Sequence, residues 1–79
     1  MTGPMSRKLP RVTAREIIAV LGKRGFSFSR QSGSHKIYRN NSGKRVTVPF
    51  HGGKILHPKV LKSILRDAEI EENKLNDLL

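Results

Sequence analysis

The segment Gly33-Ser34-His35 places an imidazole directly after a glycine, in a chain with a large excess of positive charge. Histidine is the side chain whose ordinary pKa lies near neutral pH, so it can accept or donate a proton there. Lysine and arginine outnumber aspartate and glutamate by 16 to 6, and the net charge is +10. Phosphate backbones neutralise such a surface with favourable release of counterions. The combination is suited to binding and cutting a polyanion.

The neighbours of His35 allow several roles. Gly33 permits a positive φ or the close approach of a phosphate, and it equally suits an ordinary β-turn. Ser34 offers a hydroxyl that can bind a phosphate oxygen or cap the turn. Lys36 adjoins His35 but points to the opposite face of a regular strand, so it would reach the same substrate group only if the strand began irregularly. Gly33, Ser34 and Lys36 are therefore supporting candidates beside His35.

The chain has two further histidines. His51 follows an expected strand, where it can serve as a second acid–base group or hydrogen-bond the loop. His57 precedes Pro58, where capping a helix is the better interpretation. The histidines lack the spacing of metal ligands, and five of the six carboxylates lie in the last 13 residues. We expect neither a metal site nor another cofactor.

Basic residues gather on or beside the expected strands and their loops. We interpret them as contacts to a nucleic-acid backbone, which position the strand without recognising its sequence, although an ordinary cationic surface is the alternative. No apolar run approaches the roughly 18 residues of a membrane span, and no signal-peptide pattern is present, which predicts a cytoplasmic protein without membrane partners. The backbone-contact candidates are Arg30, Lys36, Arg39, Lys44, Arg45 and Lys54.

The first element that must position these residues is a helix. Thr13 and Glu16 form a capping-box pattern, in which each side chain can bond the other residue's backbone N–H. Apolar residues then recur at helical spacing, and Gly25 is a natural C-terminal stop. The apolar positions are Ala14, Ile17, Ile18 and Leu21.

Three short strands are expected next, at residues 26–29, 36–39 and 45–49, from period-two alternation and β-branched residues. Ser32-Gly33 and residues 40–43 supply turn residues between them. Two tight connections of this kind predict an antiparallel meander.

A second helix begins at Pro58, which is well placed as a first helical residue. Leu75, Leu78 and Leu79 indicate a short helix in the acidic tail. The order α-β-β-β-α predicts an α+β fold: a three-stranded antiparallel sheet with both helices on one face and the other face open. We expect residues 1–8 to be a disordered extension or a cloning remnant and residues 9–79 to form a single domain.

Three stretches of this chain together resemble the HicA toxins, messenger-RNA interferases of bacterial and archaeal toxin–antitoxin pairs. The stretches are residues 33–39 (Gly-Ser-His-Lys-Ile-Tyr-Arg), 45–51 (Arg-Val-Thr-Val-Pro-Phe-His) and 61–66 (Leu-Lys-Ser-Ile-Leu-Arg). The resemblance covers about residues 9–70. It implies a fold similar to a double-stranded-RNA-binding domain, in agreement with the element order above.

The resemblance also implies a small metal-independent endoribonuclease that acts on messenger RNA. Its catalytic histidine would be His35, and its partner would be a HicB-type antitoxin that covers the site. Whether His35 is the general base or the general acid stays open, and His51 and Lys36 are candidates for the second proton-transfer group. The alternative is a non-catalytic RNA-binding module of the same fold.

Overall fold

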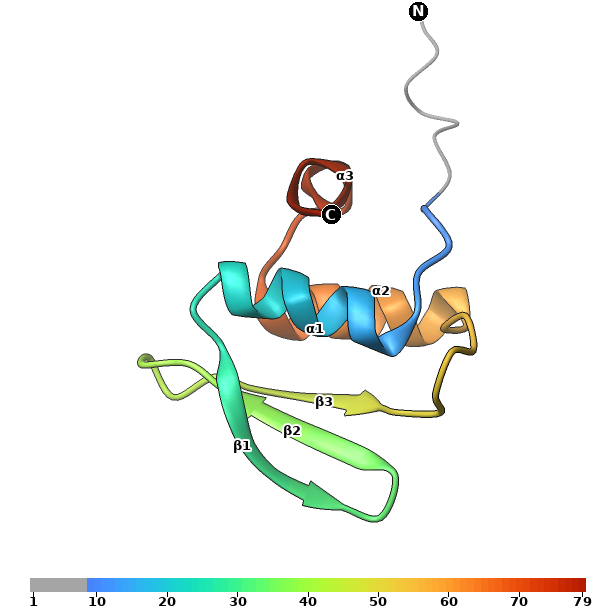
Figure 1. Ribbon diagram of the computed structural model, residues 1–79. Coiled ribbons are helices and arrows are strands. Elements are labelled where there is room, and N and C mark those ends of the chain that lie inside the picture. Colours follow the sequence, from blue (N-terminus) through green and yellow to red (C-terminus); the bar gives the residue numbers. More distant parts are fainter. Residues whose placement is uncertain (1–8) are drawn as a thin grey trace, which may run out of the picture.

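Three strands form one antiparallel sheet, and the two main helices lie together on one side of it (Figure 1). The computed structural model describes residues 9–79, so the prediction for residues 1–8 lies outside the described residues. The α+β fold predicted from the order of elements is confirmed. The elements are α1 (Ala14–Lys23), β1 (Ser27–Ser32), β2 (His35–Arg39), β3 (Arg45–Pro49), α2 (Pro58–Ala68), a 3₁₀ turn η2 (Glu72–Lys74) and α3 (Leu75–Leu78).

Helix α1 begins and ends where its sequence predicts. The Thr13 hydroxyl accepts a hydrogen bond from the Glu16 backbone N–H at 3.3 Å, and the Glu16 carboxylate accepts one from the Thr13 backbone N–H at 2.8 Å. This capping box satisfies two N–H groups that the first helical turn would leave unpaired. Gly25 has a φ of +88°, the left-handed conformation that ends helices at glycine.

The sheet has the order β1-β2-β3, so β2 is paired on both edges. The pairing of β2 with β3 is regular throughout, and it sets His35 opposite Pro49 and Arg39 opposite Arg45. The register of β1 against β2 shifts between Phe28 and Arg30, as a β-bulge does.

The first strand and its turn differ from the prediction. Strand β1 runs from Ser27 to Ser32, and the connection is Gly33-Ser34 instead of Ser32-Gly33. Gly33 has a φ of +58°, and a glycine at the first of two turn residues is typical of a tight type II′ hairpin. The predicted strand, residues 26–29, therefore starts one residue too early and ends three residues too soon.

The hydrophobic core lies between the helices and one face of the sheet. The sheet contributes Tyr38, Val46 and Val48, whose exposed fractions are 7% or less. The opposite face is largely exposed, with Ile37 buried outside the main cluster. The helices contribute Ala14, Ile17, Val20 and Leu21 from α1 and Leu61, Ile64, Leu65 and Ala68 from α2.

The acidic tail is part of the folded structure. Ile70 and Leu75 are buried in the same core, and Leu78 packs against it. The ammonium of Lys23 in α1 donates a hydrogen bond of 2.6 Å to the Leu78 carbonyl. Within residues 9–79, no helix is both long and apolar enough to cross a membrane.

Candidate active site

His35 is the first residue of β2, and its side chain is exposed. The hairpin turn before it is held by two hydrogen bonds: Gln31 Nε2 donates to the Gly33 carbonyl at 2.9 Å, and the Phe50 N–H donates to the Ser34 carbonyl at 2.7 Å. Gly33 therefore provides the positive φ of the turn. The Ser34 carbonyl connects the turn to Phe50, the residue after β3. The backbone that presents His35 is anchored on both sides.

His35 lines an open depression of about 280 Å³ to which both the sheet and α2 contribute residues. Thr47 and Pro49 form its β3 side. Helix α2 supplies Lys59, Val60, Ser63 and Ile64. Among the described residues, no carboxylate lines this depression. It thus joins an acid–base group to an ammonium group and a hydroxyl, a set that suits an anionic substrate with a proton to transfer.

Lys59 and Ser63 are residues that sequence reasoning missed. They lie four residues apart on α2, a spacing that places two side chains on the same helix face. That spacing was visible in the sequence. It carries no information on which strand the helix face meets, because α2 is separated from His35 by more than twenty residues.

Three of the residues predicted to contact a nucleic-acid backbone share the exposed sheet face with His35. They are Arg30, Arg39 and Arg45. Side chains alternate along a strand, so His35, Ile37 and Arg39 lie on one face of β2. Arg30 is paired with Ile37, and Arg45 is paired with Arg39. Arg39 and Arg45 lie at the far end of the sheet, about 13 Å from His35 by the rise of an extended strand.

Lys44 and Lys54, the two lysines outside β2 that were predicted to contact a nucleic-acid backbone, have different surroundings. Lys44 Nζ lies 2.6 Å from a Glu69 carboxylate oxygen, so its charge is partly neutralised in the folded chain. Lys54 belongs to the loop after β3 and lines a second depression of about 220 Å³.

That second depression also contains the other two histidines. His51 and His57 line it, and it shares Pro49 and Val60 with the depression of His35. His51 thus lines the depression that adjoins the one of His35, and its role as the second proton-transfer group stays a prediction. His57 Nδ1 accepts a hydrogen bond of 3.0 Å from the Lys59 N–H, which confirms the predicted helix cap.

Lys36 lies on the opposite side of the sheet from His35, as expected for a regular strand. Its ammonium nitrogen is 3.9 Å from the centre of the Phe50 ring. The Arg15 guanidinium carbon is 5.5 Å from the same ring centre. Lys36 therefore does not share the depression of His35.

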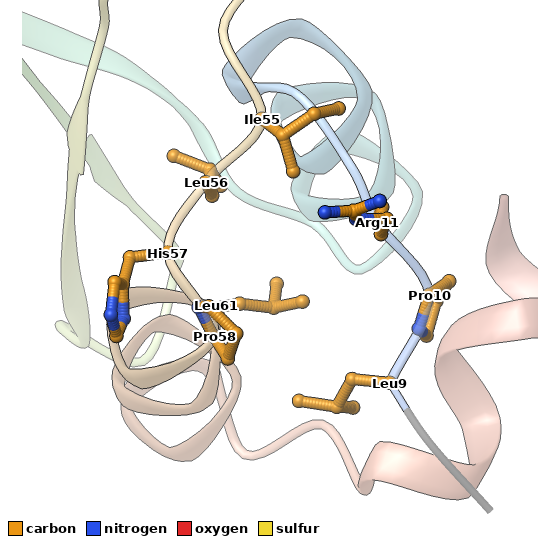
Figure 2. Close-up of a pocket in the computed structure, with 8 residues that line it drawn as sticks. All are labelled: Leu9, Pro10, Arg11, Ile55, Leu56, His57, Pro58 and Leu61. Carbon is orange, nitrogen blue, oxygen red and sulfur yellow. The ribbon is translucent and has the colours of Figure 1, made fainter.

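A third depression, of about 240 Å³, is mostly apolar and lies between the N-terminal segment and the start of α2 (Figure 2). The side chains of Leu9 and Leu61 extend into it. The segment is held there by a hydrogen bond of 2.8 Å from the Leu56 N–H to the Val12 carbonyl. Arg11 and His57 are the polar side chains among its lining residues. Within residues 9–79, no cluster of three metal-ligating side chains occurs.

Comparison with known proteins agrees with the resemblance drawn from the sequence. The sequence model of one family, described as the HicA toxin of bacterial toxin–antitoxin systems, matches residues 14–70. That range runs from the first residue of α1 through the end of α2 and includes His35, Lys59 and Ser63. A comparison with curated proteins finds no significant match. The match covers most of the chain, and the chain belongs to the HicA toxin family, the toxin components of bacterial toxin–antitoxin systems.

Proposed function

We propose that this chain is an endoribonuclease toxin that cuts messenger RNA with His35 as a proton-transfer group. One observation carries the proposal: the exposed His35 lines a depression that contains a lysine and, within residues 9–79, no carboxylate, beside a sheet face that carries three arginines. A membership in a toxin family supports the same activity. RNA as the substrate makes the cytoplasm the site of action.

The chemistry needs no nucleophile from the protein. The 2′-hydroxyl of the RNA loses a proton to a base and attacks the adjacent phosphorus, and the 5′-oxygen leaves with a proton from an acid. The products are a 2′,3′-cyclic phosphate and a 5′-hydroxyl. His35 takes one of these two proton-transfer roles, and no metal ion is required in either.

Lys59 is the best placed group to stabilise the negative charge that develops on the phosphate oxygens. It lines the same depression as His35, and a fixed cation near a developing oxyanion lowers the barrier of the reaction. The Ser63 hydroxyl lies in the same depression and can donate a hydrogen bond to a phosphate oxygen. Arg30, Arg39 and Arg45 hold the flanking backbone of the RNA on the sheet face.

A HicB-type antitoxin would inhibit this activity by covering the exposed sheet face. Toxins of this family act within toxin–antitoxin systems, so an antitoxin partner is expected. An inhibitor with an acidic surface suits the arginines of this face, because complementary charge favours fast and specific association.

The test is metal-free RNA cleavage by a set of matched variants. Wild-type protein, His35→Ala, Lys59→Gln and Lys62→Gln are incubated with single-stranded RNA in the presence of a chelator, and the ends of the products are identified. We expect 2′,3′-cyclic phosphate ends, a loss of roughly 100-fold or more for His35→Ala, and a loss of at least tenfold for Lys59→Gln. Lys62 is exposed on the same helix and lines none of these depressions, so Lys62→Gln controls for the loss of one positive charge.

Each outcome decides between assignments. Equal cleavage by wild type and His35→Ala would remove His35 from the mechanism. No cleavage by any variant, with salt-dependent RNA binding retained, would identify a non-catalytic RNA-binding module instead. Because the His35 side chain is exposed, its truncation leaves the core unchanged, and circular dichroism checks this.

A further inference from the structure

Two cations meet at one aromatic ring on the helix side of the sheet. Arg15 from α1 and Lys36 from β2 both place their charged groups within 5.5 Å of the centre of the Phe50 ring. The three side chains line a depression of about 380 Å³ together with Ile18, Ala19 and Tyr38. The attraction of each cation to the ring face holds it in place.

This arrangement concentrates positive charge without an anion to balance it. Among residues 9–79, no carboxylate lines the depression. Glu16, the acidic residue next to Arg15, uses one carboxylate oxygen to accept hydrogen bonds from the Thr13 backbone N–H and hydroxyl. Like charges repel, and an anion bound in the depression that Arg15 and Lys36 both line relieves that repulsion. The site therefore fits a phosphate.

The site also lies next to the depression of His35, across a single segment of backbone. Pro49 lines the His35 depression, and Phe50, the next residue, lines this one. His35 and Lys36 are likewise consecutive and face opposite sides of the sheet. A single strand of RNA that crosses the end of the sheet beside the β1–β2 turn meets His35 on one face and Lys36 with Arg15 on the other.

We propose that Arg15 and Lys36 form a second subsite, which binds a phosphodiester of the RNA strand beside the one that is cut. This rests on the proposed function. In the subsite, Phe50 is a positioning residue: its ring orders the two cations and does not itself contact the phosphate. The depression near His35 provides the chemistry, and this subsite sets how the strand passes through it.

The test measures binding apart from cleavage. The ligand is a single-stranded RNA oligonucleotide with 2′-O-methyl groups, which has no attacking hydroxyl, and its dissociation constant is measured by fluorescence anisotropy over a range of salt concentrations. The double variant Arg15→Gln/Lys36→Gln is compared with Arg24→Gln/Lys62→Gln, which removes the same two charges at exposed positions away from these depressions.

We expect the Arg15→Gln/Lys36→Gln protein to bind at least tenfold more weakly than its charge-matched control. The logarithm of the association constant decreases linearly with the logarithm of the salt concentration. The magnitude of this slope should be smaller by roughly 0.7 in the Arg15→Gln/Lys36→Gln protein, the contribution of one phosphate on a single strand. Phe50→Leu should weaken binding, because leucine fills space but has no ring face to attract the two cations. Phe50→Tyr keeps the ring and should bind RNA as wild type does. If the ring only filled space, Phe50→Leu would bind as tightly as wild type.

The other outcomes would overturn the subsite. Equal affinity and equal slope in the two double variants, with wild-type cleavage intact, would remove the subsite and leave the proposed function standing. If the Arg15→Gln/Lys36→Gln protein lost affinity for a glutamate-rich peptide but kept its affinity for RNA, the depression would be a protein-docking site. If wild-type protein bound no RNA at low salt, both the subsite and the proposed function would fail.

Discussion

The imidazole of His35 and the ammonium of Lys36 are neighbours in the chain, yet they serve different sides of the molecule. Side chains alternate along a strand, and the regular pairing of β2 with β3 leaves no irregularity that would bring the two together. For the reaction proposed here, the cation beside His35 is therefore Lys59 from α2. The residue next in sequence instead reaches Phe50 on the other face.

A second residue-scale effect concerns Tyr38, the only tyrosine in the chain. Its side chain lies in the core with its ring edge-on to Phe28, at 5.8 Å between ring centres. Burial disfavours the charged phenolate and raises the pKa of Tyr38 above its usual value of 10.0. The folded state thus holds the phenol proton more tightly than the unfolded state does.

This predicts a loss of stability in alkali with a definite sign. Below pH 10 both states keep the proton, and the contribution of Tyr38 is fully present. As the pH rises above 10, the unfolded state loses its proton first, so the free energy of unfolding falls until the pH exceeds the folded pKa.

Urea unfolding at pH 8 and at several values above 10 measures the effect, with Tyr38→Phe as the matched control that keeps the ring and removes the titrating group. Identical pH dependence in wild type and Tyr38→Phe would show that the phenol contributes nothing. The two proteins differ only in the Tyr38 hydroxyl, so the effects of alkali on the rest of the chain cancel in the comparison.

At the scale of elements, both main helices and the β1–β2 turn have local causes. The capping box starts α1, Gly25 ends it, and His57 with Pro58 starts α2. The tight Gly33-Ser34 turn sets the register that places His35 at the start of β2. These local signals explain why the order of elements was predictable from the sequence.

The capping box of α1 supports a prediction about stability. Thr13→Ala removes the hydroxyl that accepts the Glu16 N–H, and we expect a loss of about 1 kcal/mol in the free energy of unfolding. Thr13→Ser keeps that hydroxyl and should stay close to wild type. Chemical denaturation of the three proteins measures the difference. If Thr13→Ser lost as much as Thr13→Ala, the methyl group of Thr13 would be the important part of the side chain.

The sequence predicted the bounds of β1 less accurately, because they depend on how β1 pairs with β2. Phe26 and Phe28 alternate as if they shared a strand face, but Phe26 is 5% exposed in the core before β1, and Phe28 is 55% exposed. The bulge after Phe28 changes the pairing of β1 with β2. Such a shift depends on how the neighbouring strand is placed, so alternation within one strand does not reveal it.

At the scale of the whole molecule, opposite charges are separated along the chain but brought together in space. Five of the six acids lie in residues 67–79. That segment packs back on the body through Ile70 and Leu75, and Glu69 pairs with Lys44. Both partners of this pair are well exposed, so the pair contributes little to stability. The apolar contacts of the tail are what attach it.

We therefore predict that the tail is needed for folding. Leu75 is fully buried, and Leu75→Ala should lower the free energy of unfolding by about 2–5 kcal/mol. Leu79, which is 46% exposed, is the matched control, and Leu79→Ala should change little. Thermal and urea unfolding measure both. If the tail contributed only its negative charge, Leu75→Ala and Leu79→Ala would change the free energy of unfolding by equal, small amounts.

The sequence by itself predicted the order of the elements and the family, and it made His35 the candidate catalytic residue, because these depend on short-range patterns: a capping box, alternation of apolar residues, turn glycines and the spacing of three motifs. Only the tertiary structure decided which groups surround His35. Lys59 and Ser63 of α2 line the same depression as His35, and His51 lines a neighbouring one. It also brought Arg15 and Lys36 together on Phe50. The physical reason is that contacts between distant segments follow from how helices pack on a twisted sheet, and no local pattern encodes that packing.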